Sequence, residues 1–145
     1  MKIQTKFYGE VEAETTQCIE FVKPLLGFEN QTQFAVLPAL EGLSPFSMMQ
    51  SLEDVNLAFY VIDPWVVDVD YEFELTPEQI EKLEVSTSED LKVLTLVTID
   101  RDIEKMTTSL VAPIIVNMKN QKAMQIVLHQ SAYTTKHLIL TPKAC

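Results

Sequence analysis

The sequence predicts an all-β, mainly antiparallel fold, built as a barrel-like or sandwich sheet with one short helix around residues 77–84. Two observations predict this class. Short apolar or alternating runs recur along the whole chain, and only brief turns separate them, which disfavours the helical crossovers of a βαβ fold. Residues 2–7 and 11–14 also alternate around Tyr8-Gly9, a pattern typical of an opening hairpin.

The later strands are predicted from apolar, β-branched and aromatic segments that end at proline, glycine or polar turns. The run at 57–62 is unbroken and is expected to be buried on both faces. Pro113 interrupts an apolar segment, which places it at a sheet edge or bulge. The strands predicted after the hairpin lie at 18–22, 33–37, 46–52, 57–62, 67–75, 91–99, 110–112, 114–116, 123–129 and 136–140.

Residues 67–75 carry the most regular pattern in the chain. Asp63-Pro64-Trp65 is expected to end the preceding strand, because proline lacks an amide donor. After it, apolar and acidic residues alternate, so a strand would place them on opposite faces. The outer face would hold Asp68, Asp70, Glu72 and Glu74, and the buried face Val67, Val69, Tyr71, Phe73 and Leu75.

The clearest helix start follows at Thr76. Thr76 is a good N-cap, Pro77 occupies the first helical position, and Gln79 completes a capping-box pattern. Ile80 and Leu83 are three residues apart and are expected to face the core. The helix is predicted to be about two turns long.

Acidity continues along this helix and beyond it. Between Asp63 and Asp90 the chain carries ten acids and one base, Lys82, and Glu78 and Glu81 extend the row of carboxylates into the helix. Three interpretations stay open: a solvated surface, a hard-cation site using Asp68 and Asp70, and a docking face for a basic protein.

A net charge of −10 over 145 residues narrows the classes of partner. A phosphate backbone would be repelled, so direct binding of nucleic acid is not expected, whereas a basic protein would be attracted. With 47% hydrophobic residues the chain can bury a core. We predict one domain over residues 1–145, with a loose tail at 141–145.

The first residues lack the apolar stretch of a signal peptide, and no segment is apolar for long enough to predict a membrane span. Cys18 and Cys145 lie far apart and are interpreted as free thiols in a reducing compartment. We expect a cytoplasmic protein that does not contact a membrane and is monomeric on its own.

Patterns typical of an active site are missing from the sequence. His129 and His137 are not part of a Cys/His cluster, and the three glycines are scattered. We therefore predict a protein that is not an enzyme and holds no cofactor or metal. Trp65 follows a proline corner, where full burial is difficult, so it is the first candidate for an exposed protein contact.

Several landmarks, taken in order, resemble the FliW family of flagellar assembly factors over nearly the whole chain. They are the segment 25–29, Pro45-Phe46, Gln50-Ser51-Leu52, Phe59 with Asp63-Pro64 and Tyr71, and the block 110–117 that contains Ala112-Pro113-Ile114. The chain departs from the family pattern at Leu26, where the family usually has proline.

The resemblance implies a non-enzymatic bacterial protein that binds newly made flagellin and antagonises CsrA, the RNA-binding repressor of flagellin translation. Abundant flagellin would occupy the protein and leave CsrA free to repress. Export of flagellin would release the protein to sequester CsrA, and translation would resume.

Two surfaces are predicted for these partners. CsrA, as a basic partner, is expected at the acidic residues Asp68, Asp70, Glu72, Glu74, Glu78 and Glu81. Flagellin is expected at apolar residues Phe46, Trp65, Ala112 and Pro113. A small-ligand-binding β-barrel and, less favoured, a metal-dependent hydrolase are the alternatives.

Overall fold

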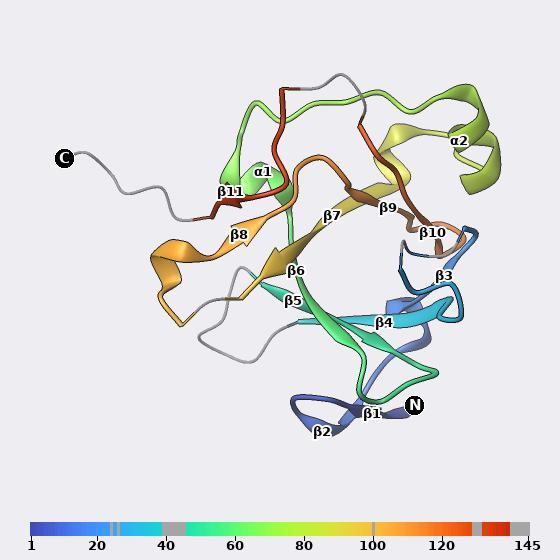
Figure 1. Ribbon diagram of the computed structural model, residues 1–145. Helices are drawn as coiled ribbons and strands as arrows, with labels where there is room; N and C mark the ends of the chain where they lie inside the picture. Colours follow the sequence, from blue (N-terminus) through green and yellow to red (C-terminus); the bar gives the residue numbers. More distant parts are fainter. Residues whose placement is uncertain (24, 26, 39–45, 100, 129–131, 140–145) are drawn as a thin grey trace.

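The computed structural model describes residues 1–23, 25, 27–38, 46–99, 101–128 and 132–139. Seven strands close into a barrel, which confirms the predicted fold class. In Figure 1 they are β3 (Cys18–Phe21), β4 (Gln33–Pro38), β5 (Ser47–Ser51), β6 (Ala58–Ile62), β7 (Leu91–Thr98), β9 (Ile114–Asn117) and β10 (Lys122–Gln125). The expectations for the tail at 141–145, and those at Leu26, Pro45 and His129, lie outside the described residues.

Antiparallel pairing joins most of the barrel strands, as predicted. The one parallel pair is β10 with β3, and antiparallel pairing of β7 with β9 closes the ring. Two further strands, β8 (Thr107–Thr108) and β11 (His137–Leu138), extend the sheet beyond the end of β7. The strand predicted at 110–112 is absent there, because Leu110, Val111 and Ala112 form a bend that leads into β9.

The barrel interior is a continuous apolar core. Alternate residues of each strand point inward, as the pleat requires, and the large aromatic Phe34 is fully buried there. The expectation that 57–62 would be buried on both faces is half right. Phe59 and Val61 pack against the interior cluster, but Tyr60 is only half-buried and its hydroxyl lies 3.1 Å from that of Tyr8.

The predicted opening hairpin covers one outer face of the barrel. β1 (Lys2–Thr5) and β2 (Gly9–Glu12) pair in register around a turn in which Gly9 has a φ of 66°. In Figure 1 this hairpin lies below β4 and β5. Its apolar side chains pack with the outward-facing Ala35, Leu37 and Met48.

A second outer face, on β7, β9 and β10, is covered by the segment between α1 (Pro64–Val67) and α2 (Pro77–Leu83) together with α2 itself. This connecting segment runs across the top of Figure 1. Phe73, Leu75 and Leu83 pack there against Val93 and Ile115 of the barrel. Burial of a large apolar side chain stabilises the fold by about 1.5–3 kcal/mol, so this covering layer adds substantially to the core.

The strand predicted at 67–75 was wrong in its first half and only partly right in its second. Asp63 accepts a hydrogen bond from the Trp65 amide at 2.9 Å, which makes Pro64 the first residue of a one-turn helix. Val69 is 81% exposed, so it does not belong to a buried face. From Tyr71 the chain is extended and the predicted alternation holds, although no described strand pairs with it.

The predicted helix is confirmed as α2, with both capping-box hydrogen bonds between Thr76 and Gln79. Leu83 is fully buried, as expected, but Ile80 is 40% exposed and does not face the core. Within the described residues, no helix is long and apolar enough to cross a membrane.

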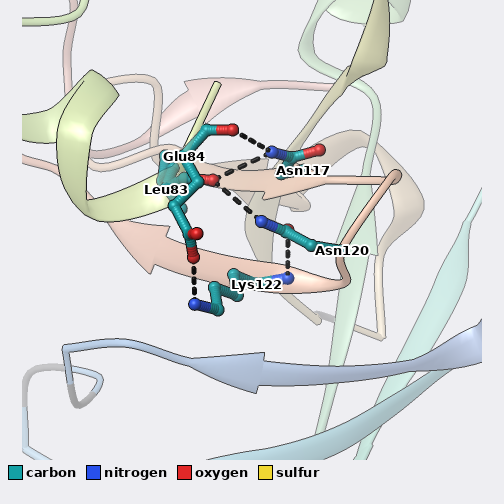
Figure 2. A network of polar contacts seen from close by, with 5 residues as sticks. All are labelled: Leu83, Glu84, Asn117, Asn120 and Lys122. Atoms are coloured by element: carbon teal, nitrogen blue, oxygen red, sulfur yellow. Dashed lines mark hydrogen bonds and ion pairs between the residues drawn. The ribbon is translucent and has the colours of Figure 1, made fainter. Parts of the chain in front are cut away.

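Asparagine side chains attach the end of α2 to the barrel, as Figure 2 shows. Glu84 ends the helix in the left-handed region at φ 54°. The buried Asn117 amide donates to the carbonyls of Leu83 at 2.8 Å and Glu84 at 3.2 Å, and Asn120 donates to Leu83 at 3.2 Å. Lys122 forms an ion pair with the Glu84 carboxylate. These contacts satisfy carbonyls that a helix end leaves without intrahelical partners.

Gln50 performs a similar task at the turn between β5 and β6. Its fully buried amide accepts a hydrogen bond from the Lys6 backbone at 2.9 Å. Its Nε2 lies 3.1–3.4 Å from the carbonyls of Ser51, Asp54, Val55 and Leu57. Gln50 therefore joins the hairpin and this turn to the barrel.

Replacing Asn117 by aspartate should destabilise the protein by about 2–4 kcal/mol, because a buried carboxylate would face two carbonyl oxygens with no donor to offer them. Asn120→Asp is the matched control, since Asn120 is exposed, and should cost less than about 1 kcal/mol. Urea unfolding measures both values. Equal losses in the two variants would contradict the role assigned to Asn117.

Gln50→Ala should lower the free energy of unfolding by about 1–3 kcal/mol, because it leaves buried backbone groups without partners. The control is Gln33→Ala, whose exposed side chain lies on the adjacent strand. Thermal unfolding followed by circular dichroism compares the two. A Gln50→Ala variant as stable as Gln33→Ala would show that water replaces the lost contacts.

Candidate protein-binding surface

The six predicted acidic residues lie along one continuous stretch of chain, on the outside of the covering layer. We call them the acidic face: Asp68, Asp70, Glu72, Glu74, Glu78 and Glu81. The first two belong to the turn after α1, the next two to the extended segment, and the last two to α2. All are exposed except the half-buried Asp68. Among the described residues, only Glu78 of this set has an ion pair, with Lys82 at 3.3 Å.

Backbone contacts hold the start of this face in place. The Asp68 carboxylate accepts a hydrogen bond from the Asp70 amide at 3.0 Å, and its carbonyl accepts one from the Tyr71 amide at 3.1 Å. The Glu72 amide donates to the Tyr133 hydroxyl at 2.8 Å. The acidic side chains therefore project from a backbone that is fixed on both sides of Tyr71.

Tyr71 is the central contact of the covering segment. Its side chain is only 2% exposed, and its hydroxyl donates to the Leu110 carbonyl at 2.8 Å. Burial, followed by the nearby Tyr133 hydroxyl, raises the pKa of Tyr71 well above its ordinary value. Tyr71 therefore stays a neutral hydrogen-bond donor over the whole physiological pH range.

Trp65 combines a fixed orientation with an accessible ring. Its indole N–H donates to the Tyr71 carbonyl at 2.7 Å, and its ring meets the Tyr71 ring edge-on with centroids 5.7 Å apart. The side chain nevertheless stays 39% exposed. This arrangement suits an aromatic contact residue, because little rotamer freedom is left to lose on binding.

Of the other apolar residues predicted to bind a partner, two lie partly at the surface and one is buried. The register Ser47↔Val61 places Phe46 at the same end of the barrel as Trp65, and Phe46 is half-buried. The half-buried Ala112 lies two residues after Leu110, whose carbonyl accepts from Tyr71. Pro113 is buried and its carbonyl accepts from Ile126, so the expectation of a surface role for Pro113 was wrong.

An apolar groove of about 550 Å³ opens beside the acidic face. Eight of its twelve lining residues are hydrophobic, and they come from α1, the extended segment, α2 with the following Val85, and the start of β7. Trp65, Ile80 and Leu91 are among these hydrophobic residues. This groove was not predicted from the sequence. Helix spacing alone could not show that Ile80 is exposed at the groove, because the same spacing fits a residue that faces the core.

Two features bear on the alternative functions, a small-ligand-binding β-barrel and a metal-dependent hydrolase. Buried side chains fill most of the barrel interior, and a smaller hollow of about 230 Å³ is lined by Ile19, Leu94 and Val116 of the interior cluster together with Lys92 and Met118. Groups of three or more His, Cys, Asp or Glu able to share a metal ion do not occur in the described part of the chain.

The tyrosine pair between the hairpin and β6 also has a shifted pKa. Burial, followed by the hydrogen bond with Tyr8, raises the pKa of Tyr60 to about 12.

Comparisons with known proteins agree on one family. The family model described as "FliW protein" matches residues 2–139. A protein of Bacillus pumilus named "Flagellar assembly factor FliW" is 46% identical over 145 residues and covers 100% of both chains. A Bacillus subtilis protein of the same name is 43% identical over 139 residues, which are 96% of each chain.

A solved structure agrees with the barrel described above. It is titled "Crystal structure of the flagellar assembly factor FliW", and it superposes with a TM-score of 0.90 at 29% identity over 99% of both chains. The sequence match, the family model and the fold thus agree over nearly the same residues, and the chain belongs to the FliW family of flagellar assembly factors.

Proposed function

We propose that this chain is a non-catalytic, cytoplasmic assembly factor that binds flagellin and, when flagellin is scarce, binds and antagonises CsrA. In this scheme flagellin export controls flagellin translation through a change of partner. The family assignment supports a role in flagellar assembly. We further propose that residues 1–145 act as one domain and that the protein is monomeric without a partner.

The observation that carries the CsrA part of the proposal is the acidic face. Five of its six residues have no ion pair among the described residues, and their side chains stand outside a rigid layer. An unpaired row of carboxylates attracts a basic protein and speeds its association. Bound beside CsrA, a chain of net charge −10 would also repel RNA.

For flagellin we propose the apolar surface at Phe46, Trp65 and Ala112, without Pro113. Trp65 is the strongest candidate, because an exposed aromatic ring held by a hydrogen bond is typical of residues that dominate binding energy. Phe46 and Ala112 are half-buried and would contribute at its side.

Calorimetric titration of the purified protein with flagellin and, separately, with CsrA tests the whole proposal. Binding to both partners is expected, and the CsrA complex should weaken more steeply between low and high salt. Failure to bind either partner would overturn the proposal.

Replacing four of the six carboxylates of the acidic face should weaken CsrA binding by about tenfold or more and flatten its salt dependence. The variant combines Asp70→Lys, Glu72→Lys and Glu74→Lys with Asp68→Asn, which keeps the oxygen that accepts from the Asp70 amide. The control makes the same change of net charge on other exposed acids, as Glu10→Lys, Glu29→Lys, Glu104→Lys and Glu20→Gln. Equal CsrA affinity in the variant and the control would refute the assignment of this face.

Trp65→Ala should weaken flagellin binding by about tenfold or more, while the lost indole hydrogen bond costs only about 1 kcal/mol of stability. Phe28→Ala is the matched control, because Phe28 is an aromatic residue of similar exposure, 37%, that packs edge-on against Phe59. It should keep flagellin binding. A collapse of the melting temperature in Trp65→Ala would instead mark Trp65 as part of the core.

A further inference from the structure

The apolar groove and the acidic face lie on the same segments of chain. In the extended segment, the groove is lined by Tyr71, Glu72, Phe73 and Leu75, and the exposed Glu74 lies between the last two in the sequence. In α2, Ile80 lines the groove next to Glu81. Glu89 and Asp90 directly precede the lining residue Leu91. Glu72 is thus a carboxylate of the groove itself, and the other acidic residues lie on the segments that form it.

Positive charge around the groove is already engaged or points elsewhere. Lys82 lies 3.3 Å from the Glu78 carboxylate. Lys92 lies between the lining residues Leu91 and Val93, but it belongs to the opposite face of β7 and lines the other hollow. The described lining of the groove is thus mainly apolar and includes the carboxylate of Glu72, and further exposed carboxylates lie on the same segments.

We infer that the groove and the acidic face form one binding surface for a basic amphipathic segment of a protein partner. Apolar side chains of that segment enter the groove between Trp65 and Ile80, and its lysine or arginine side chains meet the surrounding carboxylates. A groove of about 550 Å³ is within the range of roughly 300–1,000 Å³ that is usual for binding pockets, so it can hold a few large side chains.

The charge of a candidate partner determines whether it can bind in the groove beside these carboxylates. A second copy of this chain would bring the same carboxylates to the contact, and like charges in close contact disfavour association. An acidic or purely apolar segment would leave the carboxylates uncompensated. The inference rests on the proposed function for the identity of the partner, CsrA, and adds the chemistry of the segment that the site accepts. It also makes Trp65, proposed above as a flagellin contact, a residue that both partners use in turn.

The protein offers its own probe, because Trp65 is the only tryptophan in the chain and lines the groove. A synthetic helical peptide of leucine and lysine, with leucines three and four residues apart, is titrated while tryptophan emission is followed. We expect saturable binding that changes the emission and weakens with added salt. A permuted peptide of the same composition and a peptide with glutamate in place of lysine should bind at least about tenfold more weakly.

Ile80→Glu should lower the affinity for the leucine-lysine peptide by at least about tenfold. Its matched control is Ile99→Glu, because Ile99 is also exposed, at 50%, and lies at the other end of β7. A second variant, Ser86→Arg, adds a cation and bulk at an exposed lining position and should also weaken binding. It keeps the test decisive if Ile80→Glu folds poorly.

Several results would overturn the inference: equal binding of the permuted peptide, unchanged Trp65 emission on binding, or equal effects of the Ile80 and Ile99 variants. A dimer in sedimentation that Ile80→Glu dissociates would also overturn it, in favour of self-association. Titration with CsrA separates this inference from the proposed function. If the peptide binds as expected but CsrA does not bind, the inference stands and the CsrA assignment fails. If CsrA binds wild type and Ile80→Glu equally, the inference fails and the proposed function stands.

Discussion

The structure depends on the need to bury apolar surface on the outside of the barrel as well as inside it. Strand residues alternate between the two faces, and both faces of β7, β9 and β10 are apolar. A closed barrel satisfies its backbone hydrogen bonds but leaves this outer apolar face open to water. The extended segment from Tyr71 to Leu75 and helix α2 cover it. Because Tyr71, Phe73 and Leu75 point toward the barrel, the intervening carboxylates point to solvent. The acidic face is a consequence of this covering layer.

Side chains, more than sheet pairing, hold the covering layer in place. Tyr71 joins it to the Leu110 carbonyl, and Asn117 joins the end of α2 to β9. Trp65 is tied to the same layer through the Tyr71 carbonyl. Such contacts fix the positions of exposed residues before a partner arrives, which reduces the entropy lost on binding. The rigidity of the proposed binding surface therefore comes from a few buried polar contacts beneath it.

Much of the fold could be predicted from local pattern, because hairpin turns, strand alternation and the Thr76–Gln79 capping box act over a few residues. The errors arose where a local pattern permits two outcomes. The strand before Asp63 ends there as predicted, but Asp63 also caps a helix, which replaces the start of the strand predicted at 67–75. Ile80 has helical spacing that fits the core, but the packing of α2 leaves it at the groove. Pro113 is buried at the start of the β9–β10 hairpin, where its carbonyl accepts a hydrogen bond from the Ile126 amide. The predicted acidic residues were placed correctly on the surface, whereas the groove depends on four separate segments meeting.

The groove also couples partner binding to the stability of the layer that forms it. Phe73 and Leu75 line the groove, and they also pack against the barrel through the outer apolar cluster. A partner that fills the groove would bury the remaining exposed surface of these side chains and so favour the docked position of the segment. Because such a partner binds only the docked segment, it stabilises that arrangement by linkage. The carboxylates between these apolar residues would be held in register for the partner by the same event. Strand-like alternation of acidic and apolar residues thus serves both the packing of this protein and the chemistry of its outer surface.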